Sequence, residues 1–568
     1  MPKTDISVRE LVDKVQRREL VLPEMQRRYV WPGTRVRDLL DSLYRGYPSG
    51  TILVWETDEE VETRELAVKS TKIPITSQKL LLLDGQQRVT SLAAIVNGEP
   101  VFVRKRKKPI DILFNLEHPE GPPTEVTEVE EDESSDIDDT EDAENGQRDI
   151  QEELKKRAFV VAGRALKNDP LWVSVSDVFK KSDKEVLKPI GITSEDERWD
   201  KYSERLQRVR KIAEYQYVMQ VLESNMSYEE VTEIFVRVNS LGIKLRGSDL
   251  ALAQITSRWK GFMGLVEDLA ARFKEDEDYI LETNLPVRLL VALVTHQSRF
   301  KTVGKINIGT FQKTWAETKL GLEFAVNFVR SNAAIEGLSL LSSPFLLIPI
   351  AVYWQLKGNG SLSKQEDSML LKWLYLAHMR GHYGMGSSES ILDQDLAILY
   401  KGGTLSDLIN QLFLHVKKFT VDADDLAYKG QRSAFFSMMY FVLRQDGVQD
   451  WWSGLQISIK HVGKAHSIQF HHIFPKSLLK NASYEKKEIN EIANMAFIGG
   501  KTNRHISNKE PITYLENEVI PKRGKEALAS HLIPYDQKLL TLGGYKDFLA
   551  WRRKAIANKI NAFMKRFE

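Results

Sequence analysis

The long stretch of helical pattern over residues 261–440 is the feature that most constrains the fold. Apolar residues recur there at helical spacing, as in LPVRLLVALVTHQ and EDSMLLKWLYLAHMRGHYG, and strand-like alternation is missing from the sequence pattern. The stretches before and after it mix short apolar strands with helices. A chain of 568 residues is also too long for one core. We therefore expect an α+β, multidomain protein with a helical middle region.

The first 60 residues predict two helices and a strand. Residues 6–19 have a helical apolar spacing, and so do the residues from Val36 to Tyr44. Gly46, Pro48 and Gly50 then end the second helix. Residues 51–55 are β-branched and aromatic, which predicts a strand.

Residues 79–97, KLLLLDGQQRVTSLAAIVN, predict a buried strand from Leu80 to Leu83, a turn at Asp84 and Gly85, and a helix from Gln86 to Val96. A helix N-terminus that follows a glycine turn can bind an anion, because its unsatisfied N–H groups point outward. Three side-chain donors follow the turn, namely Gln86, Gln87 and Arg88. The residues alone leave two interpretations open: an anion site, or a plain strand-turn-helix in which Asp84 caps the helix.

Two further stretches accompany this one in the sequence. The first runs from Pro23 through Gln26, Arg27 and Tyr29 to Trp31, and the second is IFVRVNSLG at 234–242. In this order the three resemble the N-terminal domain of GmrSD-type restriction enzymes, a ParB/sulfiredoxin-like fold associated with nucleotide hydrolysis. Arg28 stands where that family often has a proline.

The resemblance implies a pocket for a nucleoside triphosphate, either ATP or GTP. The residues that would line it are Gln26, Arg27, Asp84, Gly85, Gln86, Gln87 and Arg88. Asp84 would either order a metal-bound water or cap the helix. The sequence has no G-x-x-x-x-G-K-[ST] motif, so such a site is not a P-loop.

A second informative stretch spans residues 466–509. His471 and His472 end a short β-like run, and Asn494 and Asn503 follow after a spacer. An imidazole can accept a proton from water near neutral pH. An asparagine carbonyl can ligate a divalent cation, which then neutralises charge on a phosphate. Basic residues surround Asn503, so the pattern suits hydrolysis of a phosphodiester.

This stretch resembles the HNH nuclease motif, a ββα-metal fold, in the variant found at the C-terminal end of GmrSD-type enzymes. The matching residues are His471-His472-Ile473-Phe474-Pro475, Asn494, Lys501-Thr502-Asn503-Arg504 and Asn508. The resemblance implies that His472 is the general base, oriented by Asn494. His471 and Asn503 would hold Mg²⁺ or Mn²⁺. Many members have a carboxylate in place of His471, and imidazole is a softer ligand, which weakens the preference for Mg²⁺.

The remaining DNA contacts implied by the resemblance are Lys501, Arg504 and Asn508. The basic run at 104–108 is either another phosphate contact or a solvated strand end. Arg552 to Lys565 predict a basic helical tail, which either contacts DNA or is a solvated face. The acidic stretch 124–154 predicts a disordered insertion, which is either an inert loop or a mimic of DNA.

Bulk properties agree with a cytoplasmic protein that does not enter a membrane. The sequence has no cysteine, no apolar signal core at its start and no apolar stretch long enough to span a bilayer. The absence of cysteine also disfavours structural zinc. The net charge is +1, but residues 124–154 are strongly acidic, so the rest of the chain is basic. Nucleic acid therefore stays a candidate partner.

The expected organisation is a nucleotide-binding domain at 1–260, a helical linker domain at 261–440 and an HNH nuclease domain at 441–568. Trp354, Trp373, Tyr375 and Tyr440 are expected in the helical core, and no role is assigned to His378, His382 or Tyr383.

The family would make the chain a type IV restriction endonuclease. Its substrate would be double-stranded phage DNA with hydroxymethylated or glucosylated cytosine, cleaved under NTP control, and the expected active form is a homodimer. Two alternatives stay open: a regulatory DNA-binding NTPase whose HNH module does not cleave, and an HNH nuclease that acts on RNA.

Overall fold

The computed structural model divides the chain into two compact units, Met1–Met263 and Gly264–Glu568. It is a mixed α+β protein, mostly helical with small sheets, which confirms the expected class at that level. The structure describes residues 3–23, 31–57, 63–64, 79–99, 101–103, 109–121, 154–163, 166, 169–241, 247–276, 279–384, 387–416, 418–458, 468–499, 506 and 508–567.

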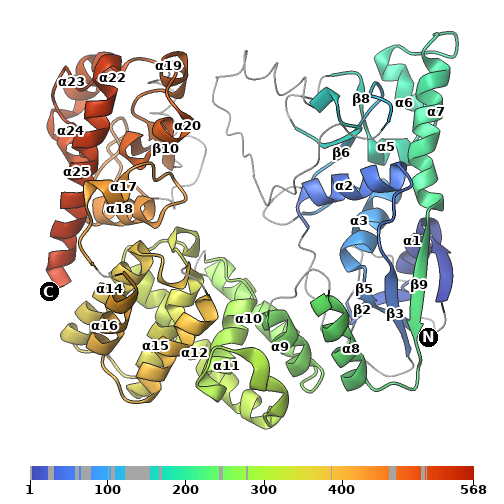
Figure 1. The fold of residues 1–568 in the computed structure, drawn as a ribbon, viewed down its shortest axis with the longest axis horizontal. Helices are drawn as coiled ribbons and strands as arrows, with labels where there is room; N and C mark the ends of the chain where they lie inside the picture. Colours follow the sequence, from blue (N-terminus) through green and yellow to red (C-terminus); the bar gives the residue numbers. More distant parts are fainter. Residues whose placement is uncertain are drawn as a thin grey trace. The chain divides into compact units, whose positions relative to one another are not determined.

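Unit 1 is built on a mixed six-stranded sheet with the order β1-β9-β3-β5-β2-β4 (Figure 1). Its strands are β1 (Lys3–Ser7), β2 (Leu20–Pro23), β3 (Ile52–Thr57), β4 (Thr63–Arg64), β5 (Lys79–Asp84) and β9 (Gln216–Leu222). β3 pairs antiparallel with β5 and parallel with β9, and β2 is parallel to β5. A second, antiparallel sheet has the order β7-β6-β8, from Phe159–Val161, Ile112–Asn115 and Trp172–Ser174.

The central strands β3 and β5 each contain four consecutive apolar residues, at 52–55 and 80–83, because both faces of the large sheet are covered. Val54 and Leu82 point into the main core of unit 1, whereas Trp55 and Leu81 belong to a second core with Phe235. The helices of the main core are α1 (Val8–Gln16), α2 (Gly33–Tyr44), α3 (Gln86–Val96), α5 (Val175–Lys180), α6 (Asp183–Leu187) and α7 (Trp199–Arg210). The second core is covered by α8 (Tyr228–Leu241) and α9 (Gly247–Thr256).

The predicted elements of unit 1 are found with small shifts. The α3 helix has the predicted bounds, but residues 3–7 form β1, so α1 starts only at Val8. Val231 and Phe235 of α8 are buried, whereas Val238 is 39% exposed. The runs 104–108 and 124–153 lie outside the described residues.

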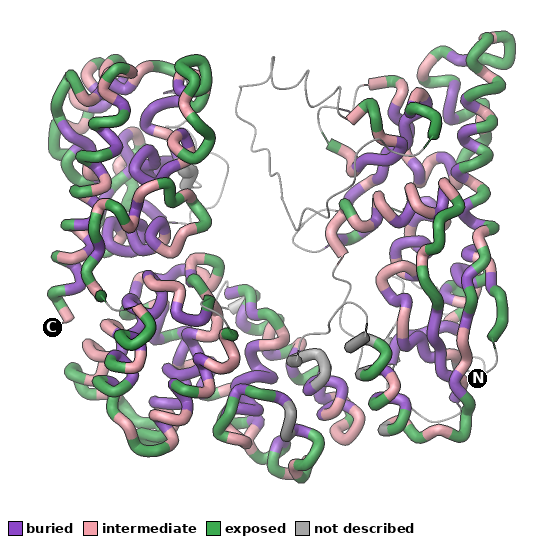
Figure 2. Tube along the Cα trace, in the orientation of Figure 1, coloured by how far each residue is buried: buried purple, intermediate pink, exposed green. Residues whose placement is uncertain are grey.

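Unit 2 begins as a helical assembly, as the sequence predicts. Its helices up to residue 445 are α10 (Phe262–Asp276), α11 (Asn284–Thr295), α12 (Ile308–Asn332), α13 (Leu347–Leu356), α14 (Lys364–Met379), α15 (Ser388–Tyr400), α16 (Leu405–Val416), α17 (Ala423–Leu426) and α18 (Ala434–Gln445). Trp373, Tyr375 and Tyr440 are fully buried, but Trp354 is half-buried and stacks on Phe324. Figure 2 shows buried residues along the inner faces of these helices.

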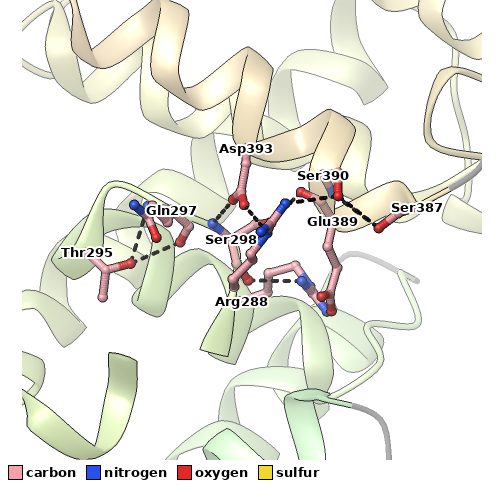
Figure 3. Close-up of polar contacts among 9 residues, drawn as sticks. Arg288, Thr295, Gln297, Ser298, Ser387, Glu389, Ser390 and Asp393 are labelled. Atoms are coloured by element: carbon pink, nitrogen blue, oxygen red, sulfur yellow. Dashed lines mark hydrogen bonds and ion pairs between the residues drawn. The ribbon is translucent and has the colours of Figure 1, made fainter. Parts of the chain in front are cut away.

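A polar cluster fastens the turn after α11 to α15 (Figure 3). Arg288, which is 4% exposed, donates to the Ser298 carbonyl oxygen and pairs with Glu389. Its guanidinium lies 4.5 Å from the centre of the Phe300 ring. The Ser298 N–H donates to Asp393 at 2.5 Å. This cluster ties α11 and the turn after it to α15 within the helical part of unit 2.

The rest of unit 2 contains a two-stranded antiparallel sheet, β10 (Ile468–His472) and β11 (Met495–Gly499), among short helices. The helices are α19 (Lys476–Asn481), α20 (Lys486–Ile489), α22 (Pro511–Tyr514), α23 (Ile520–Arg523), α24 (Glu526–Ser530) and the long α25 (Tyr545–Met564). Tyr440 of α18 packs 5.3 Å from Phe497 of β11, measured between ring centres. The compact unit therefore continues across residue 440, where the sequence suggests a domain boundary. No helix among the described residues is long and apolar enough to cross a membrane.

Candidate functional site

The histidine pair lies at the end of β10, next to the start of β11. In the antiparallel register His471 is opposite Ala496 and His472 is opposite Met495. All five residues of β11 are buried. Successive side chains of a strand point to opposite faces, so the two imidazoles have different surroundings. Of residues 500–507, which follow β11, the structure describes only Ile506, so the third element of a ββα unit stays a prediction.

His472 is half-buried and makes one polar contact through its ring. Its Nε2 lies 3.1 Å from Oδ1 of Asn490. No hydrogen bond to its Nδ1 comes from the residues that the structure describes. Burial lowers the pKa of His472 to about 3, and the charges of Lys476 and His471 act in the same direction. The imidazole is therefore neutral at pH 7, with one nitrogen available to accept a proton.

His471 is 4% exposed and faces the aromatic side of the core. Its ring centre lies 6.1 Å from that of Tyr514 and 6.3 Å from that of Trp451, both in edge-on orientation. The structure thus separates the two histidines: His471 is enclosed by aromatic rings, and His472 is the more accessible one.

Asn494 holds the chain immediately after the histidines rather than the His472 ring. Its side-chain amide accepts from the N–H of Phe474 at 2.8 Å and donates to the Phe474 carbonyl oxygen at 3.1 Å. It also donates to the Ile489 carbonyl oxygen at 3.0 Å. The Asn494 carbonyl oxygen accepts from the N–H of Ile473. Any influence of Asn494 on His472 therefore passes through the backbone of residues 473–474.

The other residues of the expected nuclease site are only partly described. Lys501, Asn503 and Arg504 lie outside the described residues. Asn508 is exposed, and its Oδ1 accepts from the Ser477 hydroxyl at 3.0 Å.

The expected cation site, an imidazole nitrogen of His471 with an amide oxygen of Asn503, stays a prediction, because Asn503 lies outside the described residues. Among the described residues, no group of three or more His, Asp or Glu side chains could hold a metal ion. A bound cation would therefore depend on Asn503, water and phosphate oxygens to complete its ligands.

In the strand-turn-helix of unit 1, Arg88 connects the start of α3 to the backbone of residues 49–51. Nη1 of Arg88 donates to the Ser49 carbonyl oxygen at 2.5 Å, and Nη2 donates to that of Thr51 at 2.7 Å. Nη2 also lies 3.4 Å from the Asp84 carboxylate. Asp84 thus pairs with Arg88, and the N-cap of α3 is Gly85, which makes no side-chain cap.

The turn geometry requires glycine at position 85. Its φ is 99°, and a Cβ would lie 2.5 Å from Cδ1 of Ile52. Among the glutamines, Gln86 is 6% exposed, and Oε1 of Gln87 accepts from the N–H of Trp31 at 3.1 Å. The structure brings Asp84, Gly85, Gln87 and Arg88 together at this turn, while Gln26 and Arg27 lie outside the described residues.

For the first two arginines of the basic tail, both interpretations, a DNA contact and a solvated face, are wrong. Arg552 is fully buried and donates to four carbonyl oxygens, those of Ala493, Met495, His531 and Leu532, at 2.7–3.0 Å. Arg553 forms a bidentate pair with the buried Glu491 at 2.6 and 2.7 Å. Inside unit 2, backbone carbonyl oxygens bind Arg552 and a buried carboxylate binds Arg553. The next exposed cation along the helix is Lys554.

Sequence reasoning missed two residues beside the histidine pair, Asn490 and Arg552. Asn490 lies four residues before Asn494, in a spacer with no fixed motif position. Arg552 lies 58 residues after Asn494 in the chain. It donates to the carbonyl oxygens of the residues immediately before and after Asn494. Only the fold brings either one to the site.

Comparison with known proteins gives two findings. An uncharacterized protein of Methanocaldococcus jannaschii (MJ0686) is 20% identical over 555 residues, which cover 91% of this chain and 87% of the relative. That likeness extends over both units. Residues 8–256 match the model of the N-terminal domain of GmrSD restriction endonucleases. The match covers most of unit 1, including the turn at Gly85 and the strands of the large sheet other than β1, and it supports a GmrSD-type restriction endonuclease N-terminal region in this chain.

Proposed function

We propose that the chain is a type IV restriction endonuclease that cleaves phage DNA with hydroxymethylated or glucosylated cytosine. The family match of residues 8–256 supports a restriction role, and DNA is the partner such a role requires. The observation that carries the cleavage step is His472, a neutral imidazole with one ring nitrogen on Asn490 and the other unbonded among the described residues.

In the proposed reaction a water molecule attacks the scissile phosphate, and Nδ1 of His472 accepts its proton. The P–O bond to the leaving sugar oxygen breaks, and that oxygen takes a proton from solvent water. The negative phosphate of bound DNA favours the protonated imidazole, which offsets part of the effect of burial. Asn494 and Arg552 keep the backbone around His472 fixed. A divalent cation held by His471 and Asn503 would supply charge stabilisation for the phosphate.

Unit 1 would act as the regulatory part and bind ATP or GTP. The turn at Gly85 starts an eleven-residue helix whose first N–H groups suit a phosphate. Arg88 donates to carbonyl oxygens beside the turn and would not bind the phosphate itself. The phosphate would instead contact the backbone N–H groups at the start of α3. The side chains that would bind it are those of Gln86, Gln87, Gln26 and Arg27. Asp84 pairs with Arg88 and would reach a metal-bound water only from that position.

A cleavage assay with the full chain tests the proposal. Unmodified and glucosyl-hydroxymethylated DNA are compared with Mg²⁺ or Mn²⁺, with and without ATP or GTP. Wild type should cut only the modified DNA. His472→Ala should slow cleavage by about 10²–10⁴-fold and leave DNA binding unchanged, because it removes only the proton acceptor.

His415→Ala is the matched control, since His415 is an exposed histidine of α16 and should leave cleavage unaffected. Equal cutting of both DNAs would remove the modification-dependent part of the proposal. If wild type cuts neither DNA with either metal, a regulatory DNA-binding NTPase takes its place, and NTP hydrolysis in Asp84→Ala becomes the next measurement.

A further inference from the structure

We propose that Asn490 is a positioning residue for the general base, and that it fixes which nitrogen of His472 accepts the proton. This inference rests on the proposed function for its catalytic meaning. Its geometric part, the hydrogen bond between Oδ1 of Asn490 and Nε2 of His472 at 3.1 Å, stands on its own.

The amide oxygen of an asparagine has lone pairs and no hydrogen, so it can only accept a hydrogen bond. Its partner Nε2 must then carry the ring hydrogen. In a neutral imidazole the other nitrogen, Nδ1, is left as the acceptor. The single contact with Asn490 therefore selects the tautomer in which Nδ1 can take a proton from water, and it also fixes the ring orientation.

The Asn490 side chain can do this because its backbone is held firmly. Asn490 ends α20, and its N–H donates to the Lys486 carbonyl oxygen at 3.1 Å. The next residue, Glu491, is fully buried and receives two hydrogen bonds from Arg553 of α25. The N–H of Tyr428 donates to the same carboxylate at 3.0 Å.

A further backbone bond ties this spacer to the helical part of unit 2. The N–H of Ile492 donates to the Lys429 carbonyl oxygen at 2.7 Å. The position of Asn490 is thus set by residues 428–429 and by α25, and not by the β10–β11 hairpin alone. Asn494, two residues beyond Ile492, fixes the backbone after His472, so the imidazole is held from both its ring and its main chain.

The side chain is also neutral, which matters beside a phosphate. A carboxylate in the same place would keep the acceptor but add a negative charge near the expected position of DNA. Asn490→Asp should therefore preserve the ring geometry and weaken DNA binding. Asn490→Leu, similar in size, removes the acceptor and frees the ring. These two variants separate positioning from packing.

The first measurement is the tautomer of His472 in the full chain without DNA, from ¹⁵N chemical shifts of the imidazole, assigned by the signals lost in His472→Ala. Wild type and Asn490→Asp should show hydrogen on Nε2, whereas Asn490→Leu should show a mixture or hydrogen on Nδ1. Hydrogen on Nδ1 in wild type, or an unchanged tautomer in Asn490→Leu, would overturn the proposal.

The second measurement is steady-state cleavage of glucosyl-hydroxymethylated DNA. Asn490→Leu should lower kcat by about 10–100-fold with little change in KM, the usual loss for an outer partner of a functional histidine. Asn490→Asp should restore kcat to within about threefold and raise KM. Equal losses of kcat in both variants would show a structural role only and contradict the proposal. Asn327→Ala, an exposed asparagine of α12, is the matched control.

The two proposals can fail separately. If His472→Ala cleaves as well as wild type, the assignment of the general base falls, while the tautomer measurement still decides what Asn490 does to the ring.

Discussion

Two arginines fasten the two motif regions, and they do so from different places in the sequence. Arg88 belongs to the D-G-Q-Q-R motif itself and bridges the carbonyls of Ser49 and Thr51. Arg552 lies far from the histidine motif in sequence and bridges four carbonyls, two of which flank Asn494. Arg88 retains 14% side-chain exposure and pairs with Asp84, whereas Arg552 is fully buried and bonds only to backbone oxygens.

The comparison shows that a basic residue near a motif is not necessarily a ligand for phosphate. Both arginines donate hydrogen bonds to backbone carbonyl oxygens of the surrounding fold. The planar guanidinium carries five N–H donors, so one side chain can serve several carbonyls at once. Burial lowers the pKa of Arg552 to about 9, which leaves it charged at neutral pH. The more deeply buried arginine should therefore be the more important one for stability.

The largest expected effect is that of Arg552→Met. The change leaves up to four buried carbonyl oxygens unpaired, each worth about 1–3 kcal/mol when nothing replaces the bond. Relaxation recovers part of this, so we expect unit 2 to lose about 4 kcal/mol of its free energy of unfolding. Guanidinium chloride unfolding of the full chain measures it. Lys554→Met, two residues along α25 and exposed, should change stability by less than about 0.5 kcal/mol.

A loss in Arg552→Met no larger than that in Lys554→Met would show that the four carbonyls find other partners. The contrast between the two motif regions would then disappear.

The two units should also differ in their response to acid. Unit 2 holds ten of the eleven histidines, and burial lowers the pKa of both His378 and His531 to about 4. The unfolded chain, with histidine pKa values near 6.5, binds more protons between about pH 6.5 and 4. Stability of unit 2 therefore falls as the pH drops through this window and levels off below it.

His531→Gln tests this sign with one residue. Comparing urea unfolding at pH 7.5 and 4.5, the variant should lose about 2 kcal/mol less than wild type, since each pKa unit corresponds to about 1.4 kcal/mol. The exposed His415→Gln serves as control and should keep the wild-type difference. An unchanged pH dependence in His531→Gln would mean that this histidine does not resist protonation in the folded state.

Much of the local structure could be predicted from the sequence because it depends on neighbours in the chain. The α3 helix has its predicted bounds since a buried strand, a glycine with φ of 99° and an apolar helix face follow one another directly. The helical pattern of residues 261–440 is equally local. The strand β1 at residues 3–7 was missed because its pairing partner, β9, lies more than 200 residues away.

The sites could be predicted less completely, for the same reason. His471, His472 and Asn494 could be proposed as site residues because the motif keeps them close in sequence, and that role stays a prediction; the structure places them at β10 and the start of β11. The motif could not show that Asn490 would meet the His472 ring, nor that Arg552 would turn inward. Both contacts depend on how α20 and α25 pack, which no local pattern specifies.

The smallest expected effect tests the other side of the comparison. Arg88→Met should destabilise unit 1 by about 2 kcal/mol, because the hydrogen bonds of its charged group are lost but the site is partly reached by water. Arg88→Lys should restore less than half, since a single ammonium cannot bridge the carbonyls of Ser49 and Thr51. Guanidinium chloride unfolding of the full chain measures both. Gly50→Ala offers an independent route, because its Cβ would meet the Arg88 guanidinium at a φ of 94°.

Nucleotide binding distinguishes this role from that of a direct ligand. If Arg88 acts through the loop at residues 49–51, Gly50→Ala and Arg88→Met should weaken ATP or GTP binding to a similar degree, in step with their loss of stability. If Arg88→Met abolishes binding at unchanged stability while Gly50→Ala binds normally, Arg88 contacts the phosphate itself. The two arginines would then differ in function as well as in burial, with only Arg552 serving the fold.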